Sequence, residues 1–294
     1  MLTTIAGAHH PVHASPEWGM NGNANSLLQA IFQDMPQKYL RQGRTNATVQ
    51  HYVSDMKALI KGRGSHPCII QWTAFNEGDC WPVFTEDNPP SVGDVIKLFK
   101  QLDPNRLVDT GSGDPAGYIP MGGPTTPGQS LAFNESGDVA DVHSYPIPAD
   151  MRPGNEHVQF GQGGTRYGMV GEYSGLGATP PDKQYLPGRC EHQNWCNCTS
   201  PGGNVPCHSC ATNMTSRLAE AYVALAQVLQ NRAASGDISA SVMTQVTDIE
   251  LECDGFLNYD RTLKFTDAEL KKIHDAHRAI VERAILSAPH AVSE

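Results

Sequence analysis

Apolar runs typical of β-strands alternate along this chain with segments of helical periodicity. The strand-like runs cover residues 27–32, 68–74, 106–110, 139–144, 167–172 and 240–247. Apolar positions at helical spacing predict helices around residues 49–60, 91–102, 215–234 and 266–284. Strands that alternate with helices are typical of parallel βα units. The pattern therefore predicts an α/β protein with six parallel strands.

Two of the predicted helices begin with a capping box. Ser91 with Asp94, and Thr266 with Glu269, have the spacing at which each side chain hydrogen-bonds the backbone N–H of the other residue.

Trp72, inside the second predicted strand, is interpreted as a core residue.

Two carboxylates stand at or just beyond the carboxyl ends of predicted strands. Glu77 follows Asn76 after the run 68–74, and Glu172 ends the run 167–172. Glutamates at the ends of two parallel strands can face each other across the mouth of a barrel. Hydrolysis of a glycosidic bond with retention of configuration needs such a pair, with carboxyl groups about 5–5.5 Å apart. Two glutamates placed at strand ends in this way therefore favour a retaining glycosidase.

Several segments resemble glycoside hydrolase family 2, the family of β-galactosidases, β-glucuronidases and β-mannosidases. The similar segments follow the family's order and are residues 31–36, 66–78, 102–109, 138–146, 171–177, and 244–250 with 259–261. The resemblance covers roughly residues 27–265. It implies a TIM-type (β/α)₈ barrel that cleaves β-linked sugars with retention, without a metal or an organic cofactor.

The same resemblance implies roles for individual residues. Glu77 matches the acid/base, Glu172 the nucleophile, and Asn76 the residue that hydrogen-bonds the sugar hydroxyl beside the anomeric carbon. His143 and Tyr145 end the strand similar to the family's sixth strand, and are candidates for binding sugar and orienting Glu172.

Two further residues are substrate-binding candidates. Asp34 ends the strand similar to the family's third strand and is a candidate hydroxyl-binding carboxylate. Trp81 is a candidate apolar platform for a sugar ring.

Some of these residues also have simpler interpretations. His143 fits a structural histidine as well as it fits a site residue, and Asp34, which precedes Met-Pro, fits a residue that ends a turn. For Asp248 and Glu250 the preferred interpretation is that they orient neighbouring loops rather than contact sugar.

The insert at residues 178–212 is rich in cysteine. Five cysteines lie between residues 190 and 210, and Cys196, Cys198, Cys207 and Cys210 have a spacing that fits a tetrahedral Zn²⁺ site. The cysteines of the insert also fit two disulfides that hold a long loop, which we favour because sequences for N-glycosylation occur nearby. Such sequences begin at Asn46, Asn134, Asn197 and Asn213.

The similar segments leave little of the chain for the start of a barrel. Residues 1–26 are expected to be irregular, and residues 27–294 to form the barrel region. The expected fold is thus an incomplete barrel of about six βα units without the family's first two strands. Missing N-terminal domains, or a partner chain that completes the barrel, would explain this.

Composition and charge exclude some classes of binding partner. The chain has 294 residues, with 21 Lys and Arg against 31 Asp and Glu, so its net charge is −10. There is no basic cluster for nucleic acid phosphates, and no apolar run reaches the ~18 residues of a membrane helix. We expect a carbohydrate substrate, no nucleic acid and no membrane. No signal peptide is recognised, but clustered cysteines and glycosylation sequences favour a secreted or lumenal location.

The leading hypothesis is a retaining β-glycosidase. The alternative is a non-catalytic carbohydrate-binding or interaction module derived from a truncated barrel.

Overall fold

The computed structural model describes residues 2–4, 31–36, 45–76, 89–113, 137–151, 166–177, 179–187, 190, 214–236 and 238–287. Its strands are all paired in parallel. One sheet has the order β2-β3-β4, and the other has the order β1-β7-β6-β5. The strand bounds are β1 (Leu2–Thr4), β2 (Ile31–Asp34), β3 (Ile69–Thr73), β4 (Leu107–Asp109), β5 (Val139–Ser144), β6 (Tyr167–Ser174) and β7 (Ala240–Thr244).

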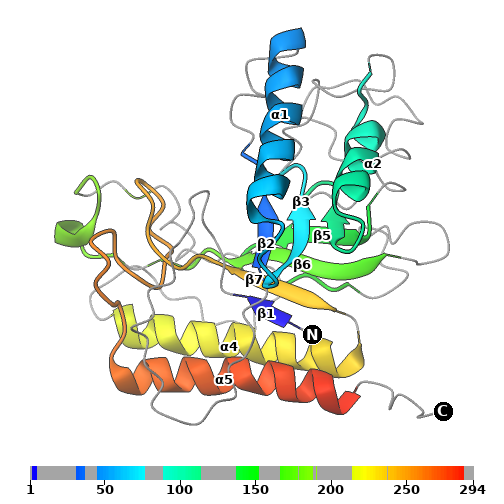
Figure 1. Ribbon diagram of the computed structural model, residues 1–294. Helices are drawn as coiled ribbons and strands as arrows, with labels where there is room; N and C mark the ends of the chain where they lie inside the picture. Colours follow the sequence, from blue (N-terminus) through cyan, green and yellow to red (C-terminus); the bar gives the residue numbers. More distant parts are fainter. Residues whose placement is uncertain are drawn as a thin grey trace, which may run out of the picture.

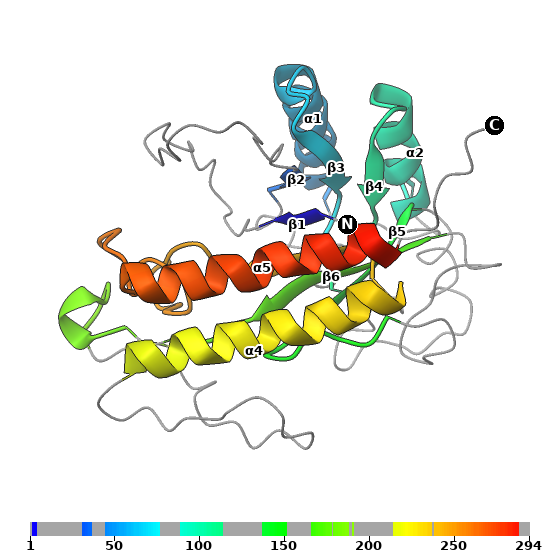
Figure 2. The same cartoon turned by 90° about the horizontal axis from the view of Figure 1, so that it is seen from below.

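Helices cover the outer faces of both sheets (Figures 1 and 2). The helices α1 (Asn46–Arg63) and α2 (Val92–Leu102) pack on the sheet of β2, β3 and β4. The helices α4 (Met214–Ser235) and α5 (Asp267–Ser287) lie side by side along the other sheet. A short 3₁₀ helix, η2 (Pro181–Lys183), follows β6. Each sheet is thus buried against a pair of helices.

The faces of the sheets turned away from the helices share an apolar layer of their own. Phe32, Leu107, Val139, Met169 and Val242 come from different strands of both sheets and pack together. Alternate residues of a strand point to opposite faces, so these side chains point inward while their neighbours pack on helices. The backbone N–H of Asp138, before β5, donates to the carbonyl of Val108 in β4 (2.8 Å) and links the two sheets. The strands therefore curl around one interior as part of an α/β barrel, and the described strands form no closed ring.

The predicted α/β fold is confirmed. All six predicted strands and all four predicted helices are present, with ends shifted by a few residues. The strand β2 overlaps the predicted run 27–32, of which residues 27–30 lie outside the described residues. Both predicted capping boxes form, at Ser91 with Asp94 and at Thr266 with Glu269.

The structure corrects one expectation at the start of the chain. Residues 1–26 were expected to be irregular, but Leu2–Thr4 forms β1, which pairs in parallel with β7 from Ala240 to Val242. Three residues are too short for a recognisable sequence pattern, and the ladder with β7 defines this strand. The rest of that segment lies outside the described residues. No helix in the described ranges is long and apolar enough to cross a membrane.

Arg106 ties together the amino-terminal ends of β3 and β4. Its Nε donates to the carbonyl of Ile69 (2.6 Å), and its Nη2 donates to the carbonyls of Gly64 (2.8 Å) and His66 (2.9 Å). Its Nη1 pairs with Asp103, whose Oδ2 also accepts from the buried indole N–H of Trp72 (3.0 Å). Burial opposes ionisation of Asp103, but hydrogen bonds from Arg106 and Trp72 hold the pKa of that carboxyl below its ordinary value.

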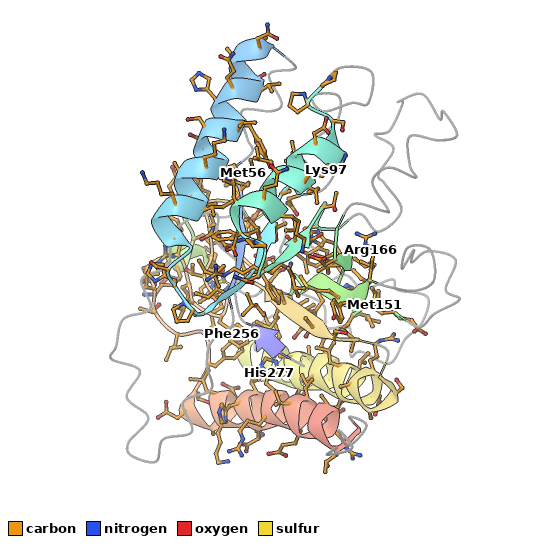
Figure 3. The ribbon with its side chains drawn as sticks, turned by 45° about the vertical axis from the view of Figure 1, so that its right-hand side comes forward. Met56, Lys97, Met151, Arg166, Phe256 and His277 are labelled. Atoms are coloured by element: carbon orange, nitrogen blue, oxygen red, sulfur yellow. A yellow bond between two sulfur atoms is a disulfide. The ribbon has the colours of Figure 1, made fainter. Side chains whose placement is uncertain are left out.

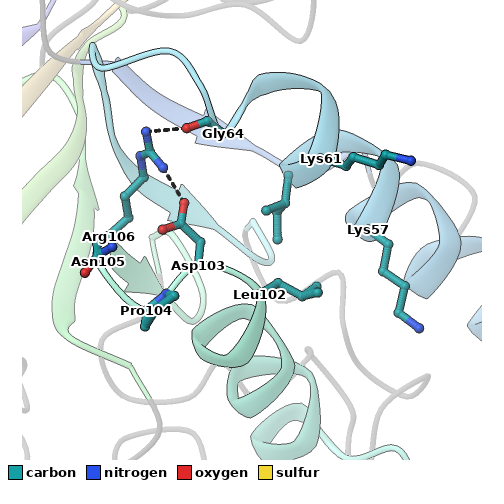
Figure 4. Close-up of a pocket in the computed structure, with 9 residues that line it drawn as sticks. Lys57, Lys61, Gly64, Leu102, Asp103, Pro104, Asn105 and Arg106 are labelled. Atoms are coloured by element: carbon teal, nitrogen blue, oxygen red, sulfur yellow. Dashed lines mark hydrogen bonds and ion pairs between the residues drawn. The ribbon is translucent and has the colours of Figure 1, made fainter.

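Arg106, Asp103 and Gly64 border a pocket of about 650 Å³ between α1 and α2 (Figure 4). The pocket lies at the amino-terminal ends of the strands, opposite the end that carries Glu172, and contains none of the predicted site residues. We interpret Arg106 as a structural residue.

We predict that Arg106→Ala lowers the free energy of unfolding by about 2–4 kcal/mol, because it removes the cationic partner of a buried carboxylate and a donor to three carbonyls. Chemical denaturation measures this change. The control is Arg278→Ala, which breaks an ion pair whose side chains are 60% and 61% exposed. It is expected to change stability by less than about 0.5 kcal/mol. Equal losses in the two variants would contradict the structural role of Arg106.

His277 makes folding sensitive to acid. It lies on the side of α5 that faces the sheet (Figure 3), on the same helix face as the buried Ile273 and Ile280. Burial lowers the pKa of His277 to about 4. The unfolded chain takes up this proton near about pH 6.5. Between these values the unfolded state binds more protons, so the stability of the fold decreases as pH falls through this interval.

We predict that His277→Leu removes a pH-dependent loss on the order of 2–3 kcal/mol between about pH 6.5 and about pH 4. Unfolding free energies of the parent and the variant across this range measure it. His274, whose side chain is 49% exposed, provides the matched control on the same helix. The idea fails if His277→Leu is as acid-sensitive as the parent protein.

Candidate active site

Glu172 lies near the carboxyl end of β6, with two polar side chains from the end of β5 on the same oxygen atom. The hydroxyl of Tyr145 donates to Glu172 Oε2. His143 Nδ1 lies 3.3 Å from the same Oε2. His143 and Glu172 are partners in the β5–β6 ladder, beside a register shift, and this places both side chains inward. The carboxylate remains 29% exposed at its side chain, whereas His143 is 7% exposed.

The environment of Tyr145 keeps its phenol protonated. Burial first, and then the Glu172 carboxylate, raise the pKa of Tyr145 above its ordinary value. Its hydroxyl also lies 3.2 Å from Thr244 Oγ1 at the end of β7. A protonated phenol can donate one hydrogen bond, and Glu172 receives it.

Further polar groups contact the other ring nitrogen of His143, Nε2. Ser112 Oγ lies 2.8 Å from His143 Nε2 and donates to Asp141 Oδ2 (2.8 Å). Asp141 Oδ1 accepts from the backbone N–H of Gly171 in β6. The contacts thus run from β4 through β5 to β6.

Two glycines allow the site side chains to lie against the backbone. Gly113 has φ +81°, and a Cβ there would lie 2.6 Å from His143 Cγ. Gly175 has φ +60°, and a Cβ there would lie 2.8 Å from Tyr145 Cδ1. Residues with side chains rarely adopt these φ values, and the space is filled, so only glycine fits at both positions.

Charged groups continue into the interior below the site. Asp109 on β4 is buried, and burial followed by the neighbouring Asp141 raises its pKa well above the ordinary value. Arg166, directly before β6 (Figure 3), is the cationic group close to this pair and donates to the carbonyl of Val139. Two carboxyls in contact cannot both ionise readily, so Asp109 retains its proton well above the ordinary range.

The segment after β7 is held by a buried ion pair. Asp248 Oδ1 lies 2.7 Å from Lys264 Nζ, and both side chains are 1% exposed. Asp248 also accepts from Thr179 Oγ1 (2.6 Å) and from the backbone N–H of Gly255 (2.9 Å). Asp248 therefore orients the loops beside the site, as its sequence context indicated. Glu250 is exposed.

The structure brings some of the predicted site residues together. Glu172, His143 and Tyr145 form one cluster, and Asn76 stands beside it, because it pairs with Ser112 through a parallel β-bridge. Asp34 is exposed at the end of β2 and near Asp109, whose pKa it helps to raise. Trp72 is buried as expected.

Other predicted site residues lie outside the described residues. Glu77 and Trp81 are among them, so the separation of the two glutamates stays a prediction. The functional roles assigned to the described residues stay predictions as well.

Sequence reasoning missed three residues of the cluster. Asp141 precedes His143 by two positions, and this period-two spacing on a strand indicates that both side chains face inward. Thr244 ends the β7 strand, where inward-facing residues also reach the site. Ser112 carried no signal, because it lies in a glycine-flanked segment without a strand pattern.

Cysteine in the insert forms at least one disulfide. Cys190 is bonded to Cys253, in the segment after β7. Disulfide chemistry was favoured for the insert, but this partner was not foreseen, because Cys253 is distant in sequence. Cys196, Cys198, Cys207 and Cys210 lie outside the described residues. Within the described ranges, no cluster of His, Cys, Asp and Glu fits a metal ion.

Comparison with protein families gives one match. Residues 19–121 match the model of glycosyl hydrolases family 2, TIM barrel domain. The resemblance of this segment to family 2 is thereby confirmed. No curated protein matches the sequence significantly.

Several solved structures are similar to this chain. A family 2 β-galacturonidase from Eisenbergiella tayi has a TM-score of 0.49 and 14% identity, over 85% of this chain and 41% of its own. A β-glucuronidase from Parabacteroides merdae has a TM-score of 0.48 and 10% identity, over 85% of this chain and 29% of its own. A family 5 mannosidase from Rhizomucor miehei has a TM-score of 0.45 and 11% identity, over 83% of this chain and 60% of its own. The chain therefore spans less than two thirds of each, and similarity at this level does not identify a substrate.

We predict that Asp109→Asn stabilises the protein increasingly as pH rises. Native Asp109 stays protonated, whereas the unfolded chain ionises near about pH 3.9, so native stability falls as pH rises from there. An amide removes this effect. Each unit of raised pKa is worth about 1.4 kcal/mol, so a gain of about 1 kcal/mol or more is expected at about pH 8.

Denaturation at about pH 4 and about pH 8 measures the difference. The control is Asp182→Asn, an exposed aspartate in η2, for which no pH-dependent change is expected. A loss of stability in Asp109→Asn that is equal at both pH values would refute the protonated state of Asp109.

Proposed function

We propose that this chain, whose residues 19–121 match the TIM barrel domain of glycosyl hydrolase family 2, is the catalytic region of a retaining β-glycosidase. Glu172 is the nucleophile and Glu77 is the acid/base. The substrate is a β-linked glycoside, and no cofactor takes part in the reaction.

The observation that carries the proposal is the arrangement around Glu172. The carboxylate stands at the carboxyl end of an interior strand, where barrel enzymes hold their catalytic groups. It is partly exposed, and Tyr145 and His143 fix its orientation through one oxygen. A nucleophile needs an accessible carboxylate that is held in one orientation. A solvated surface glutamate would have neither partner.

The reaction has two displacement steps. In the first, a Glu172 oxygen forms a bond to the anomeric carbon while the bond from that carbon to the leaving oxygen breaks, and the leaving oxygen takes the proton of Glu77. In the second, water attacks the same carbon, Glu77 takes a proton from the water, and Glu172 leaves as a carboxylate. The two inversions retain the configuration.

The remaining residues bind and orient the sugar. Asn76, beside Ser112, hydrogen-bonds the hydroxyl next to the anomeric carbon, a contact that strengthens in the transition state. Tyr145 donates to Glu172 in the resting enzyme. Asp34 at the end of β2 binds a sugar hydroxyl, and Trp81 provides an apolar platform.

Two broader proposals accompany this function. We propose a secreted or lumenal location, which the Cys190–Cys253 disulfide supports, because disulfides persist in oxidising compartments. We also propose that further domains or a partner chain complete the barrel, since the described strands form an open arrangement.

We predict that Glu172→Ala lowers turnover of aryl β-glycosides on the order of 10³-fold or more, because no covalent intermediate can form. With added azide, this variant should produce the α-glycosyl azide. Glu77→Ala should retain turnover of dinitrophenyl glycosides, whose leaving group needs no proton, and azide should then give the β-glycosyl azide. Product configuration by NMR distinguishes the two roles.

The control is Glu220→Gln, an exposed glutamate on α4, which should match the parent. Full activity of Glu172→Ala would refute the assignment. The parent is also assayed with a panel of aryl β-glycosides that differ in their sugar. If it binds sugars but hydrolyses none of these glycosides, the chain is the non-catalytic carbohydrate-binding module instead.

A further inference from the structure

The Ser112 hydroxyl stands between two groups that require opposite hydrogen-bond roles from it. Its Oγ lies 2.8 Å from Asp141 Oδ2 and 2.8 Å from His143 Nε2. A hydroxyl has one hydrogen to donate, and a carboxylate can only accept. Ser112 donates to Asp141, so the hydrogen of its hydroxyl points to that carboxyl. The Ser112 oxygen must then accept a hydrogen from His143 Nε2.

Asp141 is an acceptor in two hydrogen bonds. Its Oδ1 accepts the backbone N–H of Gly171, and its Oδ2 accepts the hydrogen of Ser112. Asp109, buried against it, is the carboxyl that retains a proton. The direction of the hydrogen-bond chain is therefore set in the interior, away from the site mouth.

The other ring nitrogen of His143 faces the proposed nucleophile. Nδ1 lies 3.3 Å from Glu172 Oε2. If Nε2 carries the hydrogen of a neutral ring, Nδ1 presents only a lone pair. A lone pair against a carboxylate oxygen is repulsive. The contact is attractive only when one more proton lies between Nδ1 and Oε2.

We infer that Ser112 and Asp141 are positioning residues that fix the His143 tautomer, so that His143 holds Glu172 only while one proton is shared between Nδ1 and Oε2. Gly113 lies directly against the imidazole, because a Cβ there would lie 2.6 Å from His143 Cγ. The inference rests on the proposed function for its kinetic consequence, whereas the tautomer itself is a property of the folded chain.

The charged and titratable groups around the ring are few among the described residues. Glu172 on β6 faces Nδ1, and Asp141 acts through Ser112 on Nε2, with Asp109 behind it. Tyr145 donates to the same Glu172 oxygen, and the carboxylates of Glu172 and Asp254 help to keep the Tyr145 phenol protonated by raising its pKa. Loss of the shared proton at high pH leaves Glu172 with Tyr145 but without an attractive contact from His143.

The sharpest test reverses the hydrogen-bond chain. In Asp141→Asn, the amide oxygen keeps the Gly171 contact and the amide nitrogen faces Ser112. The amide then donates to Ser112, Ser112 donates to His143 Nε2, and the neutral ring must carry its hydrogen on Nδ1. Ser112→Ala removes the restriction, and Ser112→Thr restores the hydroxyl.

Ring ¹⁵N NMR of histidine-labelled protein measures the tautomer without substrate, with the His143 signals assigned by their loss in His143→Gln. In the parent and Ser112→Thr we expect the hydrogen of the neutral ring on Nε2. In Asp141→Asn we expect it on Nδ1. A parent ring with its hydrogen on Nδ1, or a folded Asp141→Asn with an unchanged tautomer, would overturn the inference. Circular dichroism checks that each variant is folded.

The kinetic test uses a dinitrophenyl β-glycoside, so that the proton of Glu77 is not needed in the first step. We expect kcat/KM of the parent to fall at high pH with a one-proton dependence. In Asp141→Asn and Ser112→Ala, the pH at which kcat/KM falls should rise by at least about one unit, because a neutral ring can then donate to Glu172 from Nδ1. Ser112→Thr should follow the parent.

The two proposals fail in different ways. The expected tautomers without hydrolysis of any glycoside would overturn the proposed function and leave the tautomer assignment standing. Hydrolysis with unshifted profiles in all variants would overturn the inference and leave the glycosidase assignment standing.

Discussion

The carboxylate of Asp141 is the group on which the arrangement of the site depends. One oxygen accepts from Ser112 beyond the end of β4 and the other accepts from the Gly171 amide of β6, so a single side chain of β5 joins the two sheets. The backbone ladders do not make this connection beyond the start of β5. A buried polar group is costly unless its hydrogen bonds are made. The contacts of Asp141 with Ser112 and Gly171 satisfy this requirement.

The rest of the interior follows from that polar layer. Below it, apolar side chains from both sheets close the bottom of the barrel. Above it, the strand ends carry His143, Glu172 and Thr244 at the mouth. Gly113 and Gly175 let the backbone pass directly against His143 and Tyr145. Packing, electrostatics and chain direction therefore define the position of Glu172 together.

Much of this could be predicted from local patterns. The apolar runs and capping boxes predict the strands and helices, because these elements depend on residues close in sequence. Glu172, His143 and Tyr145 are recognisable because each stands at or just beyond a strand end. Ser112 and the partner of Cys190 are not, because their roles depend on residues about 30 or 60 positions away. The short strand β1 also depends on its distant partner β7.

The sequence alone determined the α/β class, the order of strands and helices, and the strand ends at which the candidate catalytic residues occur. These features depend on hydrophobic periodicity and turn chemistry, which are local properties. Only the tertiary structure decided which polar groups share a proton or a hydrogen bond. The direction of the bond from Ser112, the proton on Asp109 and the ring nitrogen that faces Glu172 depend on distances between strands. Such distances are set when the sheets and helices pack, because burial then removes the water that would otherwise satisfy each group separately.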